Sequence, residues 1–321
     1  MKVLVTGGAG FIGSNLVEGL LADNRVSFVR VLDNLSTGYE ENISAYFSNE
    51  KFEFIKGDIR DYETCLKACS GNNLISHQAA LGSVPRSIAD PLTTNTVNIT
   101  GTLNIFTAAK ETGISRVVYA ASSSTYGDHP GLPKVEDKIG NPLSPYAVTK
   151  FVNELYASVY GSLYNLELIG LRYFNIFGPR QNPNGPYAAV IPLFVKALLE
   201  NNPPTINGDG TNSRDFTFVT NAVQANILAL FTTNKAAVNQ VYNIACGEQT
   251  SLNQLFGALK ENADSNLKPN HGPARLGDVL HSLADISKAK ELLGYQPLVT
   301  ISQGLKTTFS WYKANSHFLH H

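Results

Sequence analysis

The sequence predicts an α/β protein built on a doubly wound parallel sheet, with a smaller α/β domain beside it. In the first half of the 321-residue chain, short β-rich segments alternate with amphipathic helical segments. This alternation is typical of a parallel sheet with helices on both faces. In the second half, Gly, Pro and Asn gather in turns such as Asn182-Pro183-Asn184, which predicts shorter elements and longer loops.

The expected elements follow in order along the chain. We expect strands at Val3–Thr6, Phe28–Leu32, Phe52–Ile55, Leu74–Ser76, Val117–Ala121 and Leu166–Leu171, and helices at about Gly10–Ala22, Tyr62–Cys69, Thr93–Lys110 and Tyr146–Tyr160. Each helix lies between two strands, as the crossovers of a parallel sheet require. Phe216–Val219 and Gln240–Ile244 also resemble strands, and we expect both to return to the sheet. The expected domains comprise residues 1–175 plus about 215–243, and about 176–214 plus 244–321.

The composition argues against several classes of protein. The net charge of −1 disfavours a nucleic-acid or membrane-surface partner. No apolar run approaches the roughly 18 residues of a membrane span, and the run that begins at Val3 is too short for a secretory signal. Cys65, Cys69 and Cys246 lack the partners of a zinc site, so we expect free thiols, no metal and a cytoplasmic location.

A glycine-rich segment predicts a dinucleotide site. Residues Thr6–Gly13 read TGGAGFIG and join the first expected strand to the first expected helix. Glycines there permit a tight turn and bring a pyrophosphate close to the backbone and the helix N-terminus. Asp33 ends the second strand, where a carboxylate accepts hydrogen bonds from ribose hydroxyls and repels a 2′-phosphate. Asn34 and Ser36 follow it in place of an arginine, so NAD is favoured over NADP.

Three further segments lie where a dinucleotide would pass. Asp58 follows the third strand at the position of an adenine edge, although an acidic residue also suits a strand-end turn. Gln78-Ala79-Ala80 follows the fourth strand, and its small side chains suit either a nearby cofactor or tight packing. Asn98 is expected to hold neighbouring backbone groups of this site in place.

A tyrosine and a lysine four residues apart predict the reactive centre. Tyr146 and Lys150 lie on one face of an expected helix. A phenol with a pKa of about 10 is a poor base at neutral pH unless a cation stabilises the phenolate. Ser122-Ser123-Ser124 ends the strand Val117–Ala121, at the sheet edge where ligands bind in open α/β folds. Alone, the pair also fits a helix surface and the serines fit a polar turn. Beside a dinucleotide site they indicate a catalytic unit.

At these residues the chain resembles the extended short-chain dehydrogenase/reductase family, specifically its nucleotide-sugar 4-epimerases. The resemblance covers nearly the whole chain. Besides the glycine loop, Asp33-Asn34, the serines and the Tyr–Lys pair, it includes Gly57-Asp58, Arg172-Tyr173-Phe174-Asn175, Gly208-Asp209-Gly210 and Arg214-Asp215-Phe216. It implies a Rossmann-type fold, tightly bound NAD, a UDP-sugar substrate and a homodimer. In the family, the helices near Thr93–Lys110 and Tyr146–Tyr160 pair across the two-fold axis.

The resemblance also implies a role for each matching residue. Tyr146 would accept a proton, Lys150 would bind the nicotinamide ribose and lower the pKa of the tyrosine, and Ser122 would bridge the sugar O4 and the tyrosine. Hydride would leave C4 for NAD and return to the other face of a 4-keto sugar, without net redox change. The residues implied to bind NAD are Gly7, Gly10, Phe11, Ile12, Gly13, Asp33, Asn34, Ser36, Gly38, Asp58, Ile59, Gln78, Ala79, Ala80, Asn98, Tyr146, Lys150 and Tyr173.

The residues implied to bind the UDP-sugar come mainly from the second half of the chain. They are Ser83, Ser122, Ser123, Ser124, Asn175, Ala189, Val190, Asn207, Arg214, Arg275, Asp278 and Ser282. Arg214 and Arg275 would hold the diphosphate, for which the planar guanidinium is suited, although surface ion pairing is an alternative. Asp278 would face the nucleotide ribose.

Short segments bear on the reaction and on the substrate. Related 4,6-dehydratases carry Asp-Glu after the catalytic Thr, whereas this chain has Ser123-Ser124, which favours epimerisation over elimination. Ser282 matches a position that holds a bulky Tyr in epimerases limited to UDP-glucose and UDP-galactose, so it leaves room for a 2-acetamido group. Gly82, where those enzymes carry a Lys, departs from them as well. We therefore expect a UDP-N-acetylglucosamine 4-epimerase.

Two alternatives stay open. The enzyme alternative is a 4-epimerase of UDP-glucose and UDP-galactose, or of a UDP-uronic acid. In a different class, the chain would be a non-catalytic NAD-binding sensor, and the presence of both Tyr146 and Lys150 argues against that class.

Overall fold

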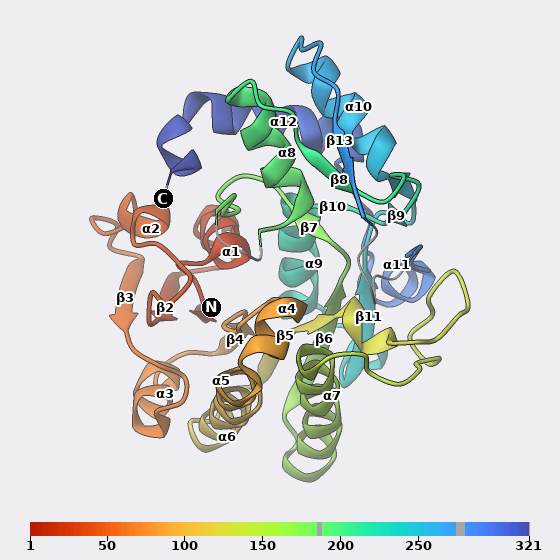
Figure 1. Cartoon of the computed structure of the whole chain (residues 1–321). Coiled ribbons are helices and arrows are strands. Elements are labelled where there is room, and N and C mark those ends of the chain that lie inside the picture. The colour runs from red at the N-terminus through yellow and green to blue at the C-terminus, as the bar shows by residue number, and fades with distance from the viewer. Residues whose placement is uncertain (185–187, 274–279, 321) are drawn as a thin grey trace.

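Seven parallel strands form the central sheet in the computed structural model of the chain, which describes residues 1–184, 188–273 and 280–320. Their order is β11-β6-β5-β4-β1-β2-β3, and every neighbouring pair is parallel (Figure 1). The strands are β1 (Lys2–Thr6), β2 (Phe28–Asp33), β3 (Phe52–Lys56), β4 (Leu74–His77), β5 (Arg116–Ser122), β6 (Glu167–Tyr173) and β11 (Gln240–Ile244). The predicted doubly wound α/β fold is confirmed.

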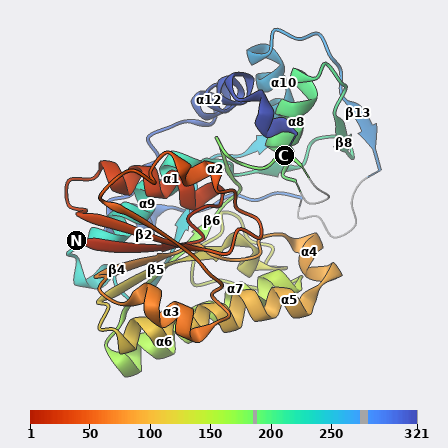
Figure 2. The same ribbon diagram turned by 90° about the vertical axis from the view of Figure 1, so that its left-hand side faces the viewer.

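Helices cover both faces of this sheet, as Figure 2 shows. One face packs against α1 (Phe11–Ala22), α9 (Val219–Phe231) and α11 (Ser287–Leu293), whose apolar side chains join one buried cluster. The other face packs against α3 (Tyr62–Cys69), α6 (Gly101–Glu111) and α7 (Pro145–Tyr164), which contribute to a second cluster. Burial on both faces explains the continuous apolar runs of the central strands.

The helix expected at Thr93–Lys110 differs in detail. The structure has α5 (Pro91–Asn95), a π-helical turn at Thr96–Thr100, and then α6. The wider turn holds Asn98, whose fully buried side chain bonds to the backbone of Leu81. Local π turns of this kind often occur near functional sites.

A smaller region with its own apolar cluster lies above the sheet in Figure 1. Its helices are α8 (Val190–Leu199), α10 (Leu252–Asn262) and α12 (Ile301–Ala314). Its short strands pair two by two, as β7 (Ile176–Phe177) with β10 (Thr217–Phe218), β9 (Ser213–Arg214) with β12 (Thr250–Ser251), and β8 (Thr205–Asn207) with β13 (Asn270–Gly272). The remaining elements are α2 (Glu41–Ser44), α4 (Val84–Ala89), and 3-10 turns at Ser123–Tyr126, Lys235–Ala237 and Ser316–Leu319.

One predicted strand did not return to the sheet. β11 pairs with β6 at the edge of the sheet, as expected for Gln240–Ile244. The segment predicted at Phe216–Val219 instead forms β10, which pairs only with β7 among the described strands, and Val219 already begins α9. The reason is that Phe218 packs against Phe177 in the smaller region, with ring centroids 5.6 Å apart.

Candidate active site

A cleft of about 910 Å³ runs along the carboxyl ends of the parallel strands, between the sheet and the smaller region. Most residues that the sequence pointed to lie on its wall. These are Gly7, Gly10, Phe11, Ile12, Gly13, Asp33, Asn34, Ser36, Asp58, Ile59, Gln78, Ala79, Ala80, Ser83, Ser122, Ser123, Tyr146, Lys150, Tyr173, Asn175 and Ala189. The carboxyl edge of an open parallel sheet is where such folds bind ligands.

A second cavity of about 650 Å³ continues from the first into the smaller region. Asn175 and Ala189 line both cavities, so the two adjoin. Val190, Asn207 and Arg214, which the sequence assigned to the substrate, line only the second one.

Several predicted site residues lie elsewhere. Ser124 and Ser282 are absent from the described walls of both cavities, and the Ser282 hydroxyl accepts a long hydrogen bond from the Asp215 amide at 3.5 Å. Gly38 and Asn98 are also absent from the described walls. Gly38 allows its loop to approach Ala9, and the Asn98 side chain hydrogen-bonds to the Leu81 backbone. Arg275 and Asp278 fall outside the described residues.

The glycine turn fits the pyrophosphate of a dinucleotide. Gly7 has φ +71°, and a Cβ there would lie 2.6 Å from the Ala79 amide nitrogen. A Cβ on Gly13 would lie 2.0 Å from the Gly7 carbonyl oxygen, so only glycine lets α1 begin this close to the turn. Gly38 likewise lets the loop after β2 approach Ala9, whose carbonyl carbon would lie 2.7 Å from a Cβ. This backbone cradle at a helix N-terminus suits a phosphate ligand.

Two carboxylates stand at this end of the cleft. Asp33 is 8% exposed and accepts hydrogen bonds from the Ala9 amide at 2.9 Å and the Leu35 amide at 2.8 Å. Burial raises its pKa, which the two amide bonds partly oppose. Asp58 pairs with Arg60 at 2.7 Å and accepts a hydrogen bond from Asn34. The Arg60 hydrogen bond is the main reason that the pKa of Asp58 falls to about 2.

A polar network fixes the floor of the cleft under Gln78. The Tyr173 hydroxyl donates to the Gln78 carbonyl oxygen at 3.1 Å, and the Asn226 amide donates to the Tyr173 hydroxyl at 2.7 Å. Gln78 in turn donates to Asn226 and to Ser76. Burial raises the pKa of Tyr173 to about 12, so this hydroxyl stays protonated and serves as a structural donor.

A second buried network joins the glycine turn to the catalytic helix. His77 lies 2.6 Å from the Thr6 hydroxyl through Nδ1 and 2.9 Å from the Thr102 hydroxyl through Nε2. Asn153, on α7, donates to the same Thr102 hydroxyl at 3.3 Å. Burial, and then the charge of Lys150, lower the pKa of His77 to about 3, so the imidazole is neutral. Sequence reasoning missed this histidine, because its apolar strand context resembles that of any core residue.

Tyr146, Lys150 and Ser122 converge on the wall of the cleft. Ser144 caps α7 by accepting from the Ala147 amide, which sets the first turn of the helix. The Lys150 ammonium lies 5.8 Å from the centre of the Tyr146 ring and donates to the Ala120 carbonyl at 2.7 Å. Burial lowers the pKa of Lys150 to about 8, which Glu154 partly opposes.

Two opposing effects act on the pKa of Tyr146. Burial raises this pKa, and an interaction with the Ser122 hydroxyl works in the opposite direction. The lowering of this pKa by Lys150, which the resemblance implies, stays a prediction.

The three serines have different positions. Ser122 is 8% exposed, and its hydroxyl accepts from the Ser124 amide at 3.1 Å and the Ser124 hydroxyl at 2.9 Å. Ser123 lines the cleft, whereas Ser124 faces Ser122. Among the described residues that line the cleft, the only carboxylates are Asp33 and Asp58. Asp33 ends β2 and Asp58 follows β3, and both strands lie on the other side of β1 from β5.

Two buried ionic groups support the walls. Arg172 and Glu154 form a two-pronged pair at 2.9 and 2.7 Å, with side chains 4% and 7% exposed. Asp215 is fully buried and accepts from the amides of Cys246, Gly247 and Ala284. Burial raises the pKa of Asp215 to about 6, against the effect of these amides.

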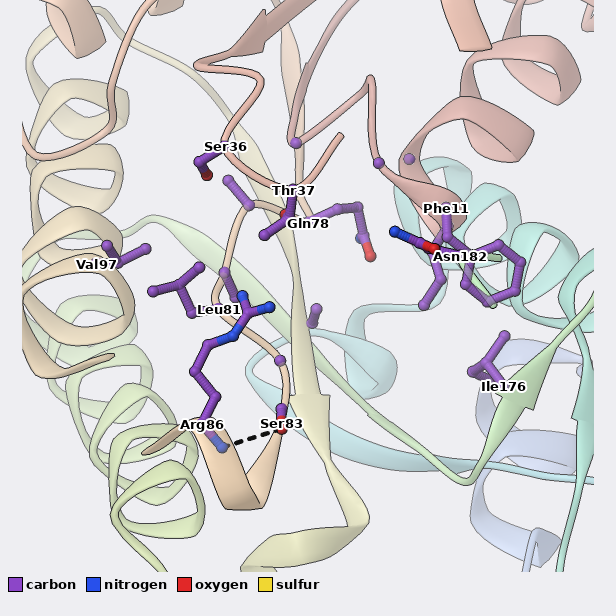
Figure 3. A pocket seen from close by; sticks show the side chains of 18 of the residues that line it. Phe11, Ser36, Thr37, Gln78, Leu81, Ser83, Arg86, Val97, Ile176 and Asn182 are labelled. Carbon is purple, nitrogen blue, oxygen red and sulfur yellow. Dashed lines mark hydrogen bonds between the residues drawn. The ribbon is translucent and has the colours of Figure 1, made fainter. Parts of the chain in front are cut away.

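The cleft also has walls that the sequence did not indicate. Figure 3 shows Asn182 on one side, near the predicted Phe11, and Leu81, Val97 and Arg86 on the other. Tyr39 and Gln181 line it too. The turn-rich segment around Asn182 signalled a loop, but nothing in it signalled where the loop would lie.

Three further findings concern the part of the chain that the structure describes. No group of three His, Cys, Asp or Glu side chains there is arranged to hold a metal ion. None of the described helices has both the length and the apolar character to cross a bilayer. Cys65 and Cys69 are free and buried, and Cys246 is free and partly buried.

Comparison with known proteins agrees with this geometry. Residues 3–245 match the model of the NAD dependent epimerase/dehydratase family. The chain is 40% identical over 318 residues to the UDP-glucose 4-epimerase of Mycolicibacterium smegmatis, with 98% of this chain and 100% of that protein covered. Its fold is similar to that of the UDP-N-acetylglucosamine 4-epimerase of Methanobrevibacter ruminantium in complex with UDP-N-acetylmuramic acid, with 39% identity, a TM-score of 0.92 and 98% of both chains covered.

The structure of a third similar protein contains a UDP-sugar and NAD. It is the UDP-glucuronic acid 4-epimerase of Bacillus cereus in complex with UDP-glucuronic acid and NAD, at 34% identity and a TM-score of 0.91, with 98% of this chain and 100% of that chain covered.

Proposed function

Because the chain belongs to the NAD dependent epimerase/dehydratase family and is an NAD-dependent nucleotide-sugar epimerase, we propose a specific substrate pair for it. We propose that it interconverts UDP-N-acetylglucosamine and UDP-N-acetylgalactosamine. The observation that carries the reaction type, 4-epimerisation, is the convergence of Tyr146, Lys150 and Ser122 beside a dinucleotide cradle. A non-catalytic sensor has no need of this arrangement.

The residues divide the chemistry between them. Ser122 and Tyr146 both line the cleft, and an interaction with the Ser122 hydroxyl works against the rise in the pKa of Tyr146, so we place both hydroxyls toward one substrate hydroxyl. Tyr146 accepts the O4 proton when C4 is oxidised and returns it when C4 is reduced, the task of a general base and acid. The protein's own groups leave the phenol protonated, since burial raises its pKa. The glycine turn and Asp33 would hold NAD, which would supply the hydride acceptor and a positive charge that favours the phenolate.

The distribution of carboxylates favours epimerisation over elimination. Loss of water from C5 and C6 of a sugar needs an acid and a base near the reacting carbons. The cleft wall near Tyr146 carries Ser122 and Ser123, while the described carboxylates stand at the nucleotide end. Hydride return to the opposite face of the 4-keto sugar is then the productive outcome.

The preference for an acetamido sugar rests on small residues. Ser282 is short, and Gly82 is exposed, with open space where a side chain would stand. Gly82 lines the cleft and leaves room there, whereas Ser282, which the resemblance assigned to the space beside the sugar C2, lies off the described walls of both cavities. UDP-glucose and UDP-glucuronic acid, substrates of similar proteins, are the competing candidates.

We further propose a homodimer formed through α7. Val148, Leu155, Val159 and Leu163 are 45%, 51%, 50% and 67% exposed and follow one another at intervals of four or seven residues. That spacing places them on one helix face, which is unusually apolar for a solvent-facing surface. Leu155→Glu is expected to convert a dimer to a monomer in light scattering after gel filtration. A wild-type chain that elutes as a monomer would sink this proposal.

We propose a cytoplasmic location, supported by the free thiols Cys65 and Cys69, because reducing compartments keep thiols unpaired. Cell fractionation with an antibody to the chain tests this. Recovery in an extracytoplasmic fraction would contradict it.

One experiment tests the function directly. The purified protein, without added NAD, is incubated separately with UDP-N-acetylglucosamine, UDP-glucose, UDP-glucuronic acid and their 4-epimers, and products are followed by NMR. We expect turnover of the acetamido pair with the highest kcat/KM. A 6-deoxy-4-keto product, or no turnover of the acetamido pair, would overturn the proposal.

A further inference from the structure

Two side chains from distant parts of the chain meet at the wall of the cleft. The Asn182 side-chain amide donates to the Tyr39 hydroxyl at 2.6 Å, across 143 residues of sequence. Tyr39 comes from the loop after β2, and Asn182 comes from the strap, which we define as residues 178–184. Both residues line the cleft. The bond therefore joins the wall of the nucleotide end to the smaller region.

Tyr39 is anchored to the glycine turn. Its amide donates to the Ala9 carbonyl at 3.0 Å, and Asn42 donates to the same carbonyl at 2.8 Å. The lack of a side chain on Gly38 allows this approach, because a Cβ there would collide with Ala9. Two hydrogen bonds thus attach the loop to the backbone that would hold a pyrophosphate.

The strap is anchored to α1 and to the smaller region. On the α1 side, Asn15 donates to the Pro179 carbonyl at 3.1 Å, and Arg180 pairs with Glu18 at 2.7 Å. On the other side, Tyr312 of α12 donates to the Gln181 carbonyl. The Asn182 side chain is held within the strap as well, because its side-chain amide oxygen Oδ1 accepts from the Asn184 backbone amide at 2.7 Å. Figure 3 shows Asn182 on the same side of the cleft as Phe11, in the first turn of α1.

We propose that the Tyr39–Asn182 hydrogen bond is a clasp that retains the dinucleotide between turnovers. A pyrophosphate at the N-terminus of α1 lies beside the two anchored segments that the bond connects. Release of the dinucleotide then requires the loop and the strap to separate. The inference rests on the proposed function, since an epimerase must keep its reduced cofactor until the hydride returns.

The clasp is tested by the rate of cofactor release. Purified wild type and Tyr39→Phe are loaded with NAD and mixed with excess isotopically labelled NAD, and exchange is followed by mass spectrometry of the protein-bound fraction. A neutral hydrogen bond of this kind corresponds to roughly threefold to tenfold faster release when it is lost. Tyr62→Phe is the matched control, because it removes a hydroxyl bonded to Glu111 at 2.6 Å away from the cleft, and it should leave release unchanged.

A mutant cycle distinguishes the clasp from general loosening. Asn182→Ala should speed release as Tyr39→Phe does, and the double variant should release no faster than either one. Asn182→Asp should restore slow release relative to Asn182→Ala, because the carboxylate accepts from the Tyr39 hydroxyl. Unfolding midpoints measured with saturating NAD should stay equal across the set.

The outcomes distinguish a failure of the clasp from a failure of the proposed function. Wild-type release rates in Tyr39→Phe, in a protein that does retain NAD, would overturn the clasp alone. Additive effects in the double variant would also overturn it. A wild-type protein that retains no NAD after gel filtration would instead contradict the proposed function.

Discussion

The two ends of the cleft are built in different ways. The cofactor end rests on neighbouring strands of one continuous sheet, and His77 and Gln78 tie its parts together through buried hydrogen bonds. The substrate end is assembled from two-stranded sheets and from α8, and includes Arg214 on β9. The difference teaches that the catalytic pair Tyr146–Lys150 is held against the continuous sheet, whereas the residues proposed to bind the substrate stand on short segments outside that sheet.

The largest effect should come from removing the phenolic hydroxyl at the cofactor end. Tyr146→Phe takes away the general base, for which losses of about 10²–10⁴ in kcat are typical. The ring and its packing remain, so bound NAD, measured by release and chromatography, should match the wild type. Substantial activity in this variant would mean that another group moves the O4 proton.

The next effect concerns the scaffold of the cofactor end. Glu154→Leu leaves Arg172 buried without its partner, which typically costs about 3–5 kcal/mol of unfolding free energy. Glu53→Gln breaks the Arg30 pair, in which the glutamate is 42% exposed, and should cost less than about 1 kcal/mol. Urea unfolding of both variants gives the two values. Equal losses would show that burial does not distinguish these pairs.

The buried Asp215 carboxylate should make the free energy of unfolding depend on pH. Its folded pKa of about 6 lies above its ordinary value of 3.8, so the folded state holds the proton more tightly. This contribution to stability is fully present below about pH 3.8 and is lost as the pH rises through about 6. Between pH 4.5 and 7.5, the wild type should lose on the order of 2 kcal/mol relative to Asp215→Asn in urea unfolding. Parallel pH profiles would rule this out.

The smallest effect should appear at the substrate end. Ser282→Tyr is expected to lower kcat/KM for UDP-N-acetylglucosamine by roughly 10–100-fold relative to UDP-glucose, the range that steric mismatch in a pocket produces. Ser287→Tyr, on the exposed start of α11, serves as a control for a new tyrosine nearby. An unchanged ratio of the two substrates would remove Ser282 from the specificity site.

Much of the fold was predictable because buried parallel strands are continuous apolar runs. Val117–Ala121 was predicted, and β5 spans Arg116–Ser122. An apolar run does not indicate which strand it pairs with, however, and Phe216–Val219 was therefore predicted in the wrong sheet. The glycine turn was predictable because all of its residues, Thr6–Gly13, are adjacent in the sequence. The Tyr39–Asn182 bond and the shared partners of His77 were not, because they join residues far apart in sequence.

The order of strands in the sheet also determines how long one strand edge stays unpaired during synthesis of the chain. β11 completes the edge of the sheet next to β6, yet the chain between them builds β7 to β10 and two helices first. At about 5–20 residues per second of translation, the roughly seventy intervening residues keep the edge of β6 unpaired for several seconds. A nascent chain stalled in that interval would present an open edge strand, the surface on which aggregation starts. Prompt synthesis of β11 therefore shortens the time for which the β6 edge stays open.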